Sequence, residues 1–353
     1  MKRNTFSAIF LMLFIFMILG TLALAEINTF IKEYTYQASE DDSRNSFQTL
    51  ALREKTRELE EFRGRSDEPL RENERLKKEL SGATGKERKK DTEAYKKTIN
   101  DLSAIEWFEK AYASNISGSH KDAVDEYSKA IEINPKDAGA YYNRGATYIS
   151  LGNYNQAIQD FSKAIEINPK YVWAYYYRGI VFGRLGDHNR ALQDFDKVIE
   201  INPKDAMAYM NRGNASGRLG DHNRAIQDYN KAIELNPKDA GAYHNRGVTY
   251  IRLGKYNQAI EDYDKAIEID PQDARAYYNR GLTYGRLNDD NRAINDYDKA
   301  IELNPKYSEA YYSRCNAYKK LGEYNRAIMD AKAAARLGLK GAQDFLSRQG
   351  IEW

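Results

Sequence analysis

The chain has 353 residues, and its 54 lysines and arginines are nearly balanced by 52 aspartates and glutamates. Because no strongly basic block stands out, the charge pattern of a dedicated nucleic-acid-binding protein is absent. The single cysteine excludes an intrachain disulfide and any metal site built from several cysteines.

The N-terminus has the pattern of a secretory signal peptide. Two basic residues precede the apolar run Ala8–Ala25, which ends in Ala-Leu-Ala. A charged start, an apolar segment and a small-x-small cleavage site predict a signal peptide over residues 1–25 and a periplasmic or secreted mature protein. The run is also just long enough to cross a bilayer, so the alternative is an uncleaved inner-membrane anchor formed by residues 8–25. No cysteine comes directly after the run, which excludes a lipoprotein anchor.

Residues 26–103 differ in composition from the rest of the chain and are expected to form a mostly helical N-terminal region. Residues 30–36 favour a short strand, whereas residues 46–62 favour a helix. Residues 70–80 carry Asn73, Leu76 and Leu80 at heptad-like spacing, as in a short coiled coil, and residues 81–91 are typical of a linker. A solvated helical spacer is one interpretation of this region, and a weak homodimer through residues 70–80 is the alternative.

An internal repeat follows. Six of the seven prolines recur every 34 residues, from Pro135 to Pro305. Taking each of them as position 32 divides residues 104–341 into seven repeats, which begin at residues 104, 138, 172, 206, 240, 274 and 308. We expect helix A at about positions 1–14 and helix B at about positions 17–31 of each repeat. A Leu-Gly turn joins the two helices, and an Asn-Pro pair ends helix B.

The spacing of small and aromatic residues predicts how these helices pack. Position 8 of helix A is glycine in five repeats, and position 24 of helix B is aromatic in six. Because no hairpin can bury its apolar face alone, neighbouring hairpins must stack. The seventh repeat departs from the pattern, and its Cys315 is expected to be a small buried residue. Residues 342–353 are expected to form the end of the chain, with a capping helix and a C-terminal tail. The capping helix itself is predicted over Gly341–Arg348.

The chain resembles the tetratricopeptide repeat family over residues 104–341. The segments Ala240–Tyr250 and Tyr256–Ile260, with Asn236-Pro237 and Asp270-Pro271, match the family's signature positions. The resemblance implies an all-α fold: a right-handed superhelical solenoid of seven helix-turn-helix hairpins plus a C-terminal capping helix. It also implies that helix A lines a concave face and that the protein is an interaction scaffold.

The sequence contains no recognisable catalytic, cofactor-binding or metal-binding constellation. His120, His188 and His222 occupy position 17 of separate repeats, so they cannot share one metal. No glycine-rich phosphate loop follows a strand, and no Ser/His/Asp arrangement is evident. We therefore expect a protein that is not an enzyme and needs neither a cofactor nor a metal.

One pair of charges recurs through the repeats. Position 7 is arginine and position 23 is aspartate in six repeats, while the first repeat has Lys110 and Glu126. Both partners change together and the charges stay opposite, which predicts a structural salt bridge between helix A and helix B. An arginine at a partly buried site suits this role, because its guanidinium offers several fixed donors to a carboxylate.

Positions 2, 6, 9 and 13 share one face of helix A, and the neighbouring position 5 adds aromatic rings. An asparagine presents both a donor and an acceptor, so a ladder of asparagines can satisfy an extended peptide backbone. This ladder is similar to one in the repeat region of O-linked N-acetylglucosamine transferases, whose catalytic domain has no counterpart here. The alternative is a merely solvated face. The candidate partner-binding residues are Asn143, Asn211, Asn245, Asn279, Tyr142, Tyr176, Tyr278, Arg184, Arg218, Arg252, Arg286 and Lys320.

The predicted function is therefore a protein–protein interaction scaffold in the cell envelope, which binds an extended and partly acidic peptide segment on the concave face. The alternative is a regulatory or substrate-presenting subunit of an envelope enzyme complex. The expected partners are one or more proteins, without nucleic acid. Contact with a membrane is expected only through an uncleaved N-terminal segment.

Overall fold

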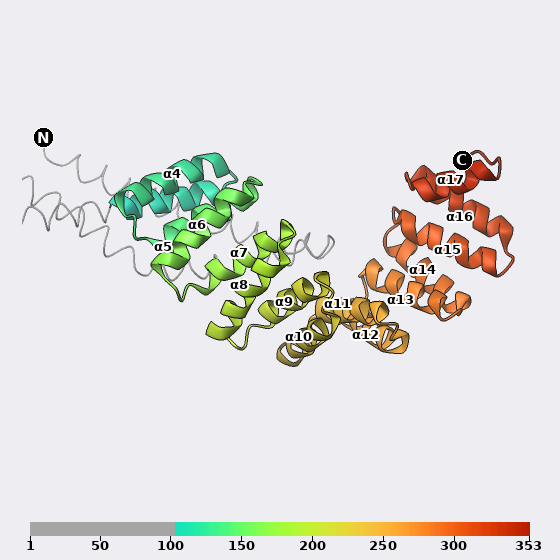
Figure 1. Ribbon diagram of the computed structural model, residues 1–353. Coiled ribbons are helices and arrows are strands. Elements are labelled where there is room, and N and C mark those ends of the chain that lie inside the picture. The colour runs from blue at the N-terminus through green and yellow to red at the C-terminus, as the bar shows by residue number, and fades with distance from the viewer. Residues whose placement is uncertain (1–102) are drawn as a thin grey trace, which may run out of the picture. The chain divides into compact units, whose positions relative to one another are not determined.

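The chain divides into two units, Met1–Leu102 and Ser103–Trp353, and the computed structural model describes residues 103–353 (Figure 1). The predictions for the signal peptide, for the N-terminal region and for residues 70–80 lie outside the described residues. The described part has a helix over residues 103–116, followed by α4 (His120–Ile133), α5 (Ala138–Ser150), α6 (Tyr154–Ile167), α7 (Val172–Arg184), α8 (His188–Ile201), α9 (Ala206–Arg218), α10 (His222–Leu235), α11 (Ala240–Arg252), α12 (Tyr256–Ile269), α13 (Ala274–Arg286), α14 (Asp290–Leu303), α15 (Ser308–Lys320), α16 (Tyr324–Arg336) and α17 (Lys340–Arg348).

These helices are the expected hairpins. In the second repeat, α5 covers positions 1–13 and α6 covers positions 17–30, so the observed ends differ from the expected ones by one residue. The same pair recurs in every later repeat, and residues 103–353 contain no strand. The prediction of an all-α solenoid of seven hairpins with a C-terminal helix is confirmed.

Local signals at both ends fix the length of helix A. After α5, Gly152 takes a left-handed conformation with φ of 75°, which ends a helix at little cost for glycine. Asn288 does the same after α13, with φ of 60°, and is the only non-glycine residue with positive φ among residues 103–353. At the start of α5, the Asp137 carboxylate accepts hydrogen bonds from the backbone N–H groups of Gly139 and Ala140 at 2.8 and 3.1 Å.

Within a hairpin, the glycine at position 8 lets the ring at position 24 lie directly against helix A. A Cβ added at Gly213 would lie 2.8 Å from Cε1 of Tyr229, closer than side-chain atoms pack. The seventh hairpin has the bulkier Cys315 at position 8, but the ring at position 24 is replaced by Ala331. Both residues are fully buried, so the two departures from the pattern compensate each other.

Successive hairpins stack in chain order, and the helix pairs α5/α6, α7/α8 and α9/α10 can be followed in Figure 1. Helix B of each hairpin packs against helix A of the next one. The helices A of neighbouring hairpins also contact one another, as α7 contacts both α5 and α9. Positions 2, 6, 9 and 13 therefore follow one another from hairpin to hairpin, and their side is called the helix A face below.

The last helix covers the seventh hairpin. Ala342 and Leu346 on α17 are fully buried in the same apolar cluster as Ala331 and Ala335 on α16. The capping helix expected at Gly341–Arg348 is therefore present as α17. Over residues 103–353, none of the helices combines the length and the apolar character that crossing a bilayer requires.

Candidate partner-binding face

The charge pair predicted from positions 7 and 23 forms in every hairpin. Each guanidinium donates through Nε and Nη2 to both carboxylate oxygens of the aspartate on its own helix B, with Nη2–Oδ1 distances of 2.5–2.8 Å. Lys110 and Glu126 form the corresponding pair in the first hairpin, at 3.0 Å. The salt bridges are Arg144–Asp160, Arg178–Asp194, Arg212–Asp228, Arg246–Asp262, Arg280–Asp296 and Arg314–Asp330.

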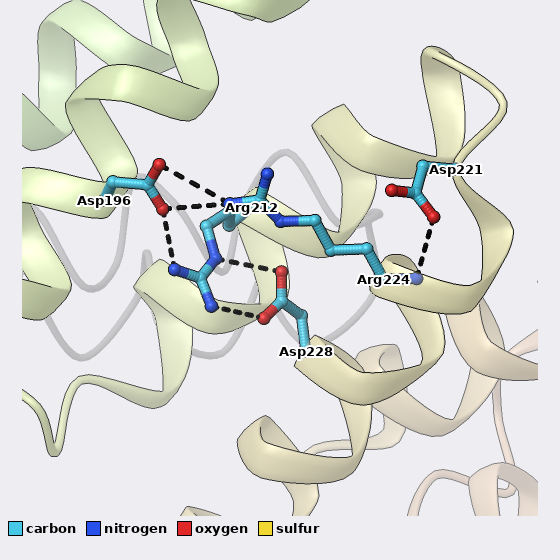
Figure 2. A network of polar contacts seen from close by, with 5 residues as sticks. All are labelled: Asp196, Arg212, Asp221, Arg224 and Asp228. Carbon is cyan, nitrogen blue, oxygen red and sulfur yellow. Dashed lines mark hydrogen bonds and ion pairs between the residues drawn. The ribbon is translucent and has the colours of Figure 1, made fainter.

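Each of these arginines also reaches the preceding hairpin, a contact that was not predicted from the sequence. Arg212 donates from Nη1 to Asp196 on α8 at 2.7 Å, and Arg224 donates to the same carboxylate at 3.1 Å (Figure 2). Position 25 supplies the acceptor at every such junction, at 2.5–2.9 Å, and the acceptors in chain order are Ser128, Ser162, Asp196, Asn230, Asp264 and Asp298.

These contacts hold the position 7 arginines in the framework of the protein. Burial acts to lower the pKa of Arg212, but its hydrogen bonds to Asp228 and Asp196 raise that pKa, so the side chain stays charged. The guanidinium also lies over the Tyr209 ring, 5.4 Å from its centre. With its donors engaged on two hairpins, Arg212 is a structural residue and has little left to offer a ligand.

The asparagines at position 6 are not equivalent. Asn143 is 4% exposed, donates from Nδ2 to the Gly139 carbonyl at 2.9 Å, and its buried Oδ1 has no partner among residues 103–353. The preceding hairpin places Phe108 at position 5, whose ring offers no polar group. Asn143 is therefore closed off from a ligand in this conformation.

Asn211 presents its oxygen to solvent. Its Nδ2 donates to the Tyr176 hydroxyl and to the Met207 carbonyl, both at 2.9 Å, which uses both amide hydrogens. Its Oδ1 accepts nothing from the described residues and is not buried. Asn279 is similar, because its Nδ2 lies 3.2 Å from Nε2 of His244, the position 5 residue of the preceding hairpin.

Asn245 differs again because Met210 precedes it at position 5. A thioether is a weak acceptor, and the Asn245 amide has no hydrogen bond to any residue between 103 and 353. Asn245 is half-buried, so both its oxygen and its nitrogen remain available. The ladder expected from the sequence therefore has one closed step at Asn143 and open steps at Asn211, Asn245 and Asn279.

Two of the three candidate tyrosines belong to the packing between hairpins. Tyr142 is 4% exposed and Tyr176 is 3% exposed. The Tyr142 ring lies against Tyr171 and Tyr177, with ring centres 5.1 and 5.7 Å apart. Their burial leaves these two rings no face to offer a ligand, contrary to our expectation. Tyr278 is half-buried, and its hydroxyl lies 3.4 Å from Ser313.

The cations at position 13 lie at the exposed end of helix A. Lys320 donates to Asp290 at 3.1 Å, and Arg286 lies over the Tyr256 ring, 6.0 Å from its centre. Both contacts reach position 17 of the preceding hairpin. Arg218 and Arg252 have no hydrogen bond or ion pair with any residue of the described range. All members of the row are exposed, namely Arg184, Arg218, Arg252, Arg286 and Lys320.

Asn214, at position 9 of α9, is a further residue of this face that was not predicted from the sequence. Its Oδ1 accepts a hydrogen bond at 2.8 Å from the hydroxyl of Tyr229, the ring that packs against Gly213. The signal was present in the sequence, because position 9 is apolar in the repeats on either side, at Ile180 and Val248. Asn214 belongs to the helix A face together with Asn211 and Arg218.

Residues that could carry chemistry are few. Between residues 103 and 353, no three His, Cys, Asp or Glu side chains gather so that they could hold a metal ion. Cys315 is fully buried, and burial raises the pKa of its thiol to about 11. The thiol is therefore protonated at neutral pH and a poor nucleophile.

Family models match most of the repeat region. A model described as TPR repeat matches residues 111–151, 218–254 and 249–288. Two models described as Tetratricopeptide repeat match residues 138–171, 172–205 and 274–307, and residues 195–227 and 296–329. Together these matches run from residue 111 to residue 329, more than half of the chain. A search of curated proteins found no match.

Solved structures share the fold. A tetratricopeptide repeat protein from Parabacteroides merdae is 23% identical, covers 69% of this chain and 98% of its own, and has a TM-score of 0.57. Pseudomonas aeruginosa pilF is 19% identical over 61% of this chain and 100% of its own, with a TM-score of 0.53. PilW, a type IV pilus biogenesis factor, is 19% identical over 59% and 98%, with a TM-score of 0.54. At these identities the likeness extends to the fold alone.

Proposed function

Because the chain belongs to the tetratricopeptide repeat family, we propose that it is a non-enzymatic scaffold of the cell envelope whose helix A face binds an extended, partly acidic segment of a partner protein. The observation that carries this proposal is a contrast between two sets of arginines. Those at position 7 are all held by aspartates of the framework. Those at position 13 are exposed, on the same face as the open asparagines.

The asparagines at position 6 and the arginines at position 13 have complementary chemistry toward such a segment. The open oxygens of Asn211 and Asn279 accept hydrogen bonds, as backbone N–H groups of an extended peptide require, while Asn245 can both donate and accept. The guanidiniums at Arg218 and Arg252 donate charge-assisted hydrogen bonds, which suit carboxylates. Asparagines that can bind a peptide backbone lie beside arginines that can bind carboxylates. This arrangement favours an extended segment with acidic side chains over a buried apolar helix as the ligand.

The proposed location rests on the N-terminal sequence, in which a basic start and an apolar run precede Ala-Leu-Ala. Cleavage after Ala25 leaves Glu26 as the first residue. N-terminal sequencing of the exported protein is therefore expected to begin at Glu26. An intact Met1 in the membrane fraction would instead support the anchored form.

The binding proposal is tested by affinity capture from the native envelope with matched variants. Arg218→Glu combined with Arg252→Glu reverses charge on the helix A face, and the captured partner is expected to be lost, most clearly at low salt. Lys231→Glu combined with Lys265→Glu makes the same charge change on helix B, where both lysines pair with glutamates. That variant is expected to retain the partner. Equal capture by all proteins would exclude the helix A face as the binding surface.

A further inference from the structure

Met210 on α9 stands where another hairpin has a hydrogen-bond acceptor. In the third hairpin, position 5 is Tyr176, whose hydroxyl accepts a hydrogen bond from Nδ2 of Asn211 at 2.9 Å. That contact spans 35 residues, and Met210 has the same spacing from Asn245. A thioether is a weak acceptor, so the Asn245 amide makes no hydrogen bond with residues 103–353.

The sulfur of Met210 reaches across to the next helix A. A Cβ added at Gly241 would lie 4.0 Å from Met210 Sδ. Gly241 precedes Asn245 by four residues, so the two are one turn apart on the same side of α11. The sulfur therefore lies beside the turn of α11 that carries the Asn245 amide.

This junction is open to small solutes. Met210 and Asn245 are both half-buried, and Gly241 is exposed. Because Gly241 has no side chain, position 2 of α11 adds no group that would cover the sulfur. The neighbouring repeats carry larger residues at position 2, namely Met207 and Arg275. A small oxidant in solution can therefore approach the Met210 thioether.

A thioether is a side chain that a two-electron oxidant modifies reversibly. With hydrogen peroxide, a lone pair of the sulfur attacks one peroxide oxygen, and the S–O bond forms as the O–O bond breaks. The displaced hydroxide takes the proton of the transferred oxygen and leaves as water. The sulfur loses two electrons and the peroxide gains them. The product is a sulfoxide, a polar group whose oxygen accepts hydrogen bonds much better than a thioether does.

We propose that Met210 is a reversible oxidation site, at which a peroxide-class oxidant forms a sulfoxide that accepts a hydrogen bond from Asn245 Nδ2. The new oxygen extends beyond the sulfur and takes the role that the Tyr176 hydroxyl has toward Asn211. Oxidation then leaves Asn245 with its Oδ1 open and with a donor withdrawn from the helix A face. This inference rests on the proposed function and deepens it, because it gives the binding face a redox regulation.

The chain contains its own references for this chemistry. Met329 on α16 is 70% exposed, at a position that is polar in the other six repeats, and Met207 is half-buried on α9. The remaining three of the six methionines lie within residues 1–25, outside the described residues. A variant with Met207→Leu and Met329→Leu therefore keeps Met210 as the one methionine of residues 103–353, with little change in side-chain volume.

The first experiment treats the full-length protein with hydrogen peroxide and follows each methionine by peptide mapping and mass spectrometry. Met329 should react readily, and Met210 should also gain one oxygen while circular dichroism shows a folded protein. A methionine sulfoxide reductase should remove that oxygen again. If Met210 stays reduced until the protein is denatured, its sulfur is closed to the oxidant and the proposal is wrong.

The second experiment measures the new hydrogen bond without any ligand. In the Met207→Leu, Met329→Leu background, melting temperatures are compared before and after oxidation, with Asn245 and with Asn245→Ala. The shift on oxidation should be more favourable with Asn245 by roughly 2–4 °C, as expected for one hydrogen bond. Because any loss of apolar packing at Met210 affects both proteins, the difference isolates the contact. Equal shifts would show that the sulfoxide does not bind Asn245.

Met210→Gln provides the same comparison without an oxidant. Its amide oxygen lies at the same distance along the side chain as a sulfoxide oxygen, whereas Met210→Leu has no acceptor. Capture of envelope proteins on the two immobilised variants is quantified by mass spectrometry. Met210→Gln should retain the partner between about two- and tenfold more weakly than Met210→Leu, the value of one hydrogen bond.

This capture separates the inference from the proposed function. If Met210→Gln and Met210→Leu retain the partner equally, while the charge reversal at Arg218 and Arg252 loses it, the binding face stands and its redox regulation is wrong. If the charge reversal has no effect on capture, the proposed face is wrong. The oxidation site and its contact with Asn245 are then still supported when the melting temperatures show the expected difference.

Discussion

Arg212 on α9 joins two hairpins, because its Nη1 donates to Asp196 on α8 at 2.7 Å while the rest of its guanidinium is held by Asp228 on α10. The two carboxylates differ in burial. The Asp228 side chain is 5% exposed, whereas the Asp196 side chain is 46% exposed. Removing the Arg212 side chain would therefore leave the buried carboxylate of Asp228 unpaired, whereas the carboxylate of Asp196 would be solvated.

The first prediction follows from this difference. Arg212→Met should lower the free energy of unfolding by about 3–5 kcal/mol, the usual cost of leaving a buried charge unpaired. Asp196→Ala should cost about 1 kcal/mol or less, because that carboxylate is half-exposed. Urea denaturation followed by circular dichroism measures both. Adding Asp228→Leu to Arg212→Met should recover stability, and a double variant no more stable than the single one would contradict this account.

The second prediction concerns the close contact inside the fourth hairpin. Gly213→Leu forces a side chain into the Tyr229 ring and should destabilise the protein by about 3 kcal/mol or more, at the upper end of overpacking costs. Gly217→Ala, one turn later on α9, meets its neighbours only at ordinary van der Waals distance. It should be neutral or stabilising by up to about 1 kcal/mol, because alanine favours a helix. Equal melting temperatures for both variants would move Gly213 out of the core.

The sequence could predict the hairpins and the salt bridges because both depend on signals within one repeat. The 34-residue proline period sets the helix ends. The joint change to Lys110 and Glu126 in the first repeat indicates that positions 7 and 23 form a salt bridge. The second partner of each arginine was not predictable in this way. Position 25 alternates among serine, aspartate and asparagine, which share only an oxygen that can accept a hydrogen bond.

The candidate site was harder to predict, because the environment of each position depends on the neighbouring hairpin. Asn143 and Asn245 occupy the same position, yet the first is 4% exposed and the second is half-buried. The residue at position 5 of the preceding repeat faces each asparagine and decides whether its amide has a hydrogen-bond partner. That residue is Phe108 for Asn143 and Met210 for Asn245. Tyr142 is buried by Tyr171, the last residue of its own repeat, and by Tyr177 on helix A of the next repeat, and this second contact cannot be seen in a single repeat.

The third prediction concerns acid stability. Burial lowers the pKa of His244 below its ordinary value of 6.5, with a smaller upward effect from Asp273 and a further lowering by Arg275. The unfolded chain therefore takes up this proton at higher pH than the folded protein does. The stabilisation is complete above about pH 6.5 and is lost as the pH falls through the range below it. Wild type should lose more stability than His244→Tyr when the pH drops from about 7 to about 5.

His244→Tyr is a suitable comparison because tyrosine already occupies the same position in α7 and α13, as Tyr176 and Tyr278. The Tyr176 hydroxyl accepts a hydrogen bond from Asn211, and Asn279 could donate to the new hydroxyl in the same way. Urea midpoints at several pH values provide the measurement. Parallel pH profiles for the two proteins would show that His244 does not titrate with folding.

The last prediction separates a binding face from a solvated one with two asparagines at the same position. Asn245 has an available amide, so Asn245→Ala should weaken the partner's binding by roughly 0.5–1.5 kcal/mol, the net value of one hydrogen bond. Its stability should change by no more than about 0.5 kcal/mol, as for other substitutions outside the core. Asn143→Ala should behave in the opposite way, because its amide is closed off and donates to the Gly139 carbonyl. It should shift the melting temperature and leave binding unchanged.

The measurement is a titration with the partner recovered by affinity capture, paired with thermal melts of both variants. Asn211→Ala and Asn279→Ala extend the comparison, since each presents one open oxygen and should show a binding loss of the same order as Asn245→Ala. These two variants also remove a hydrogen bond between hairpins, so a small drop in melting temperature should accompany the loss of binding. If Asn245→Ala melts early and binds normally, the asparagines serve packing. The helix A face would then have to recognise its partner through the cations at position 13 alone.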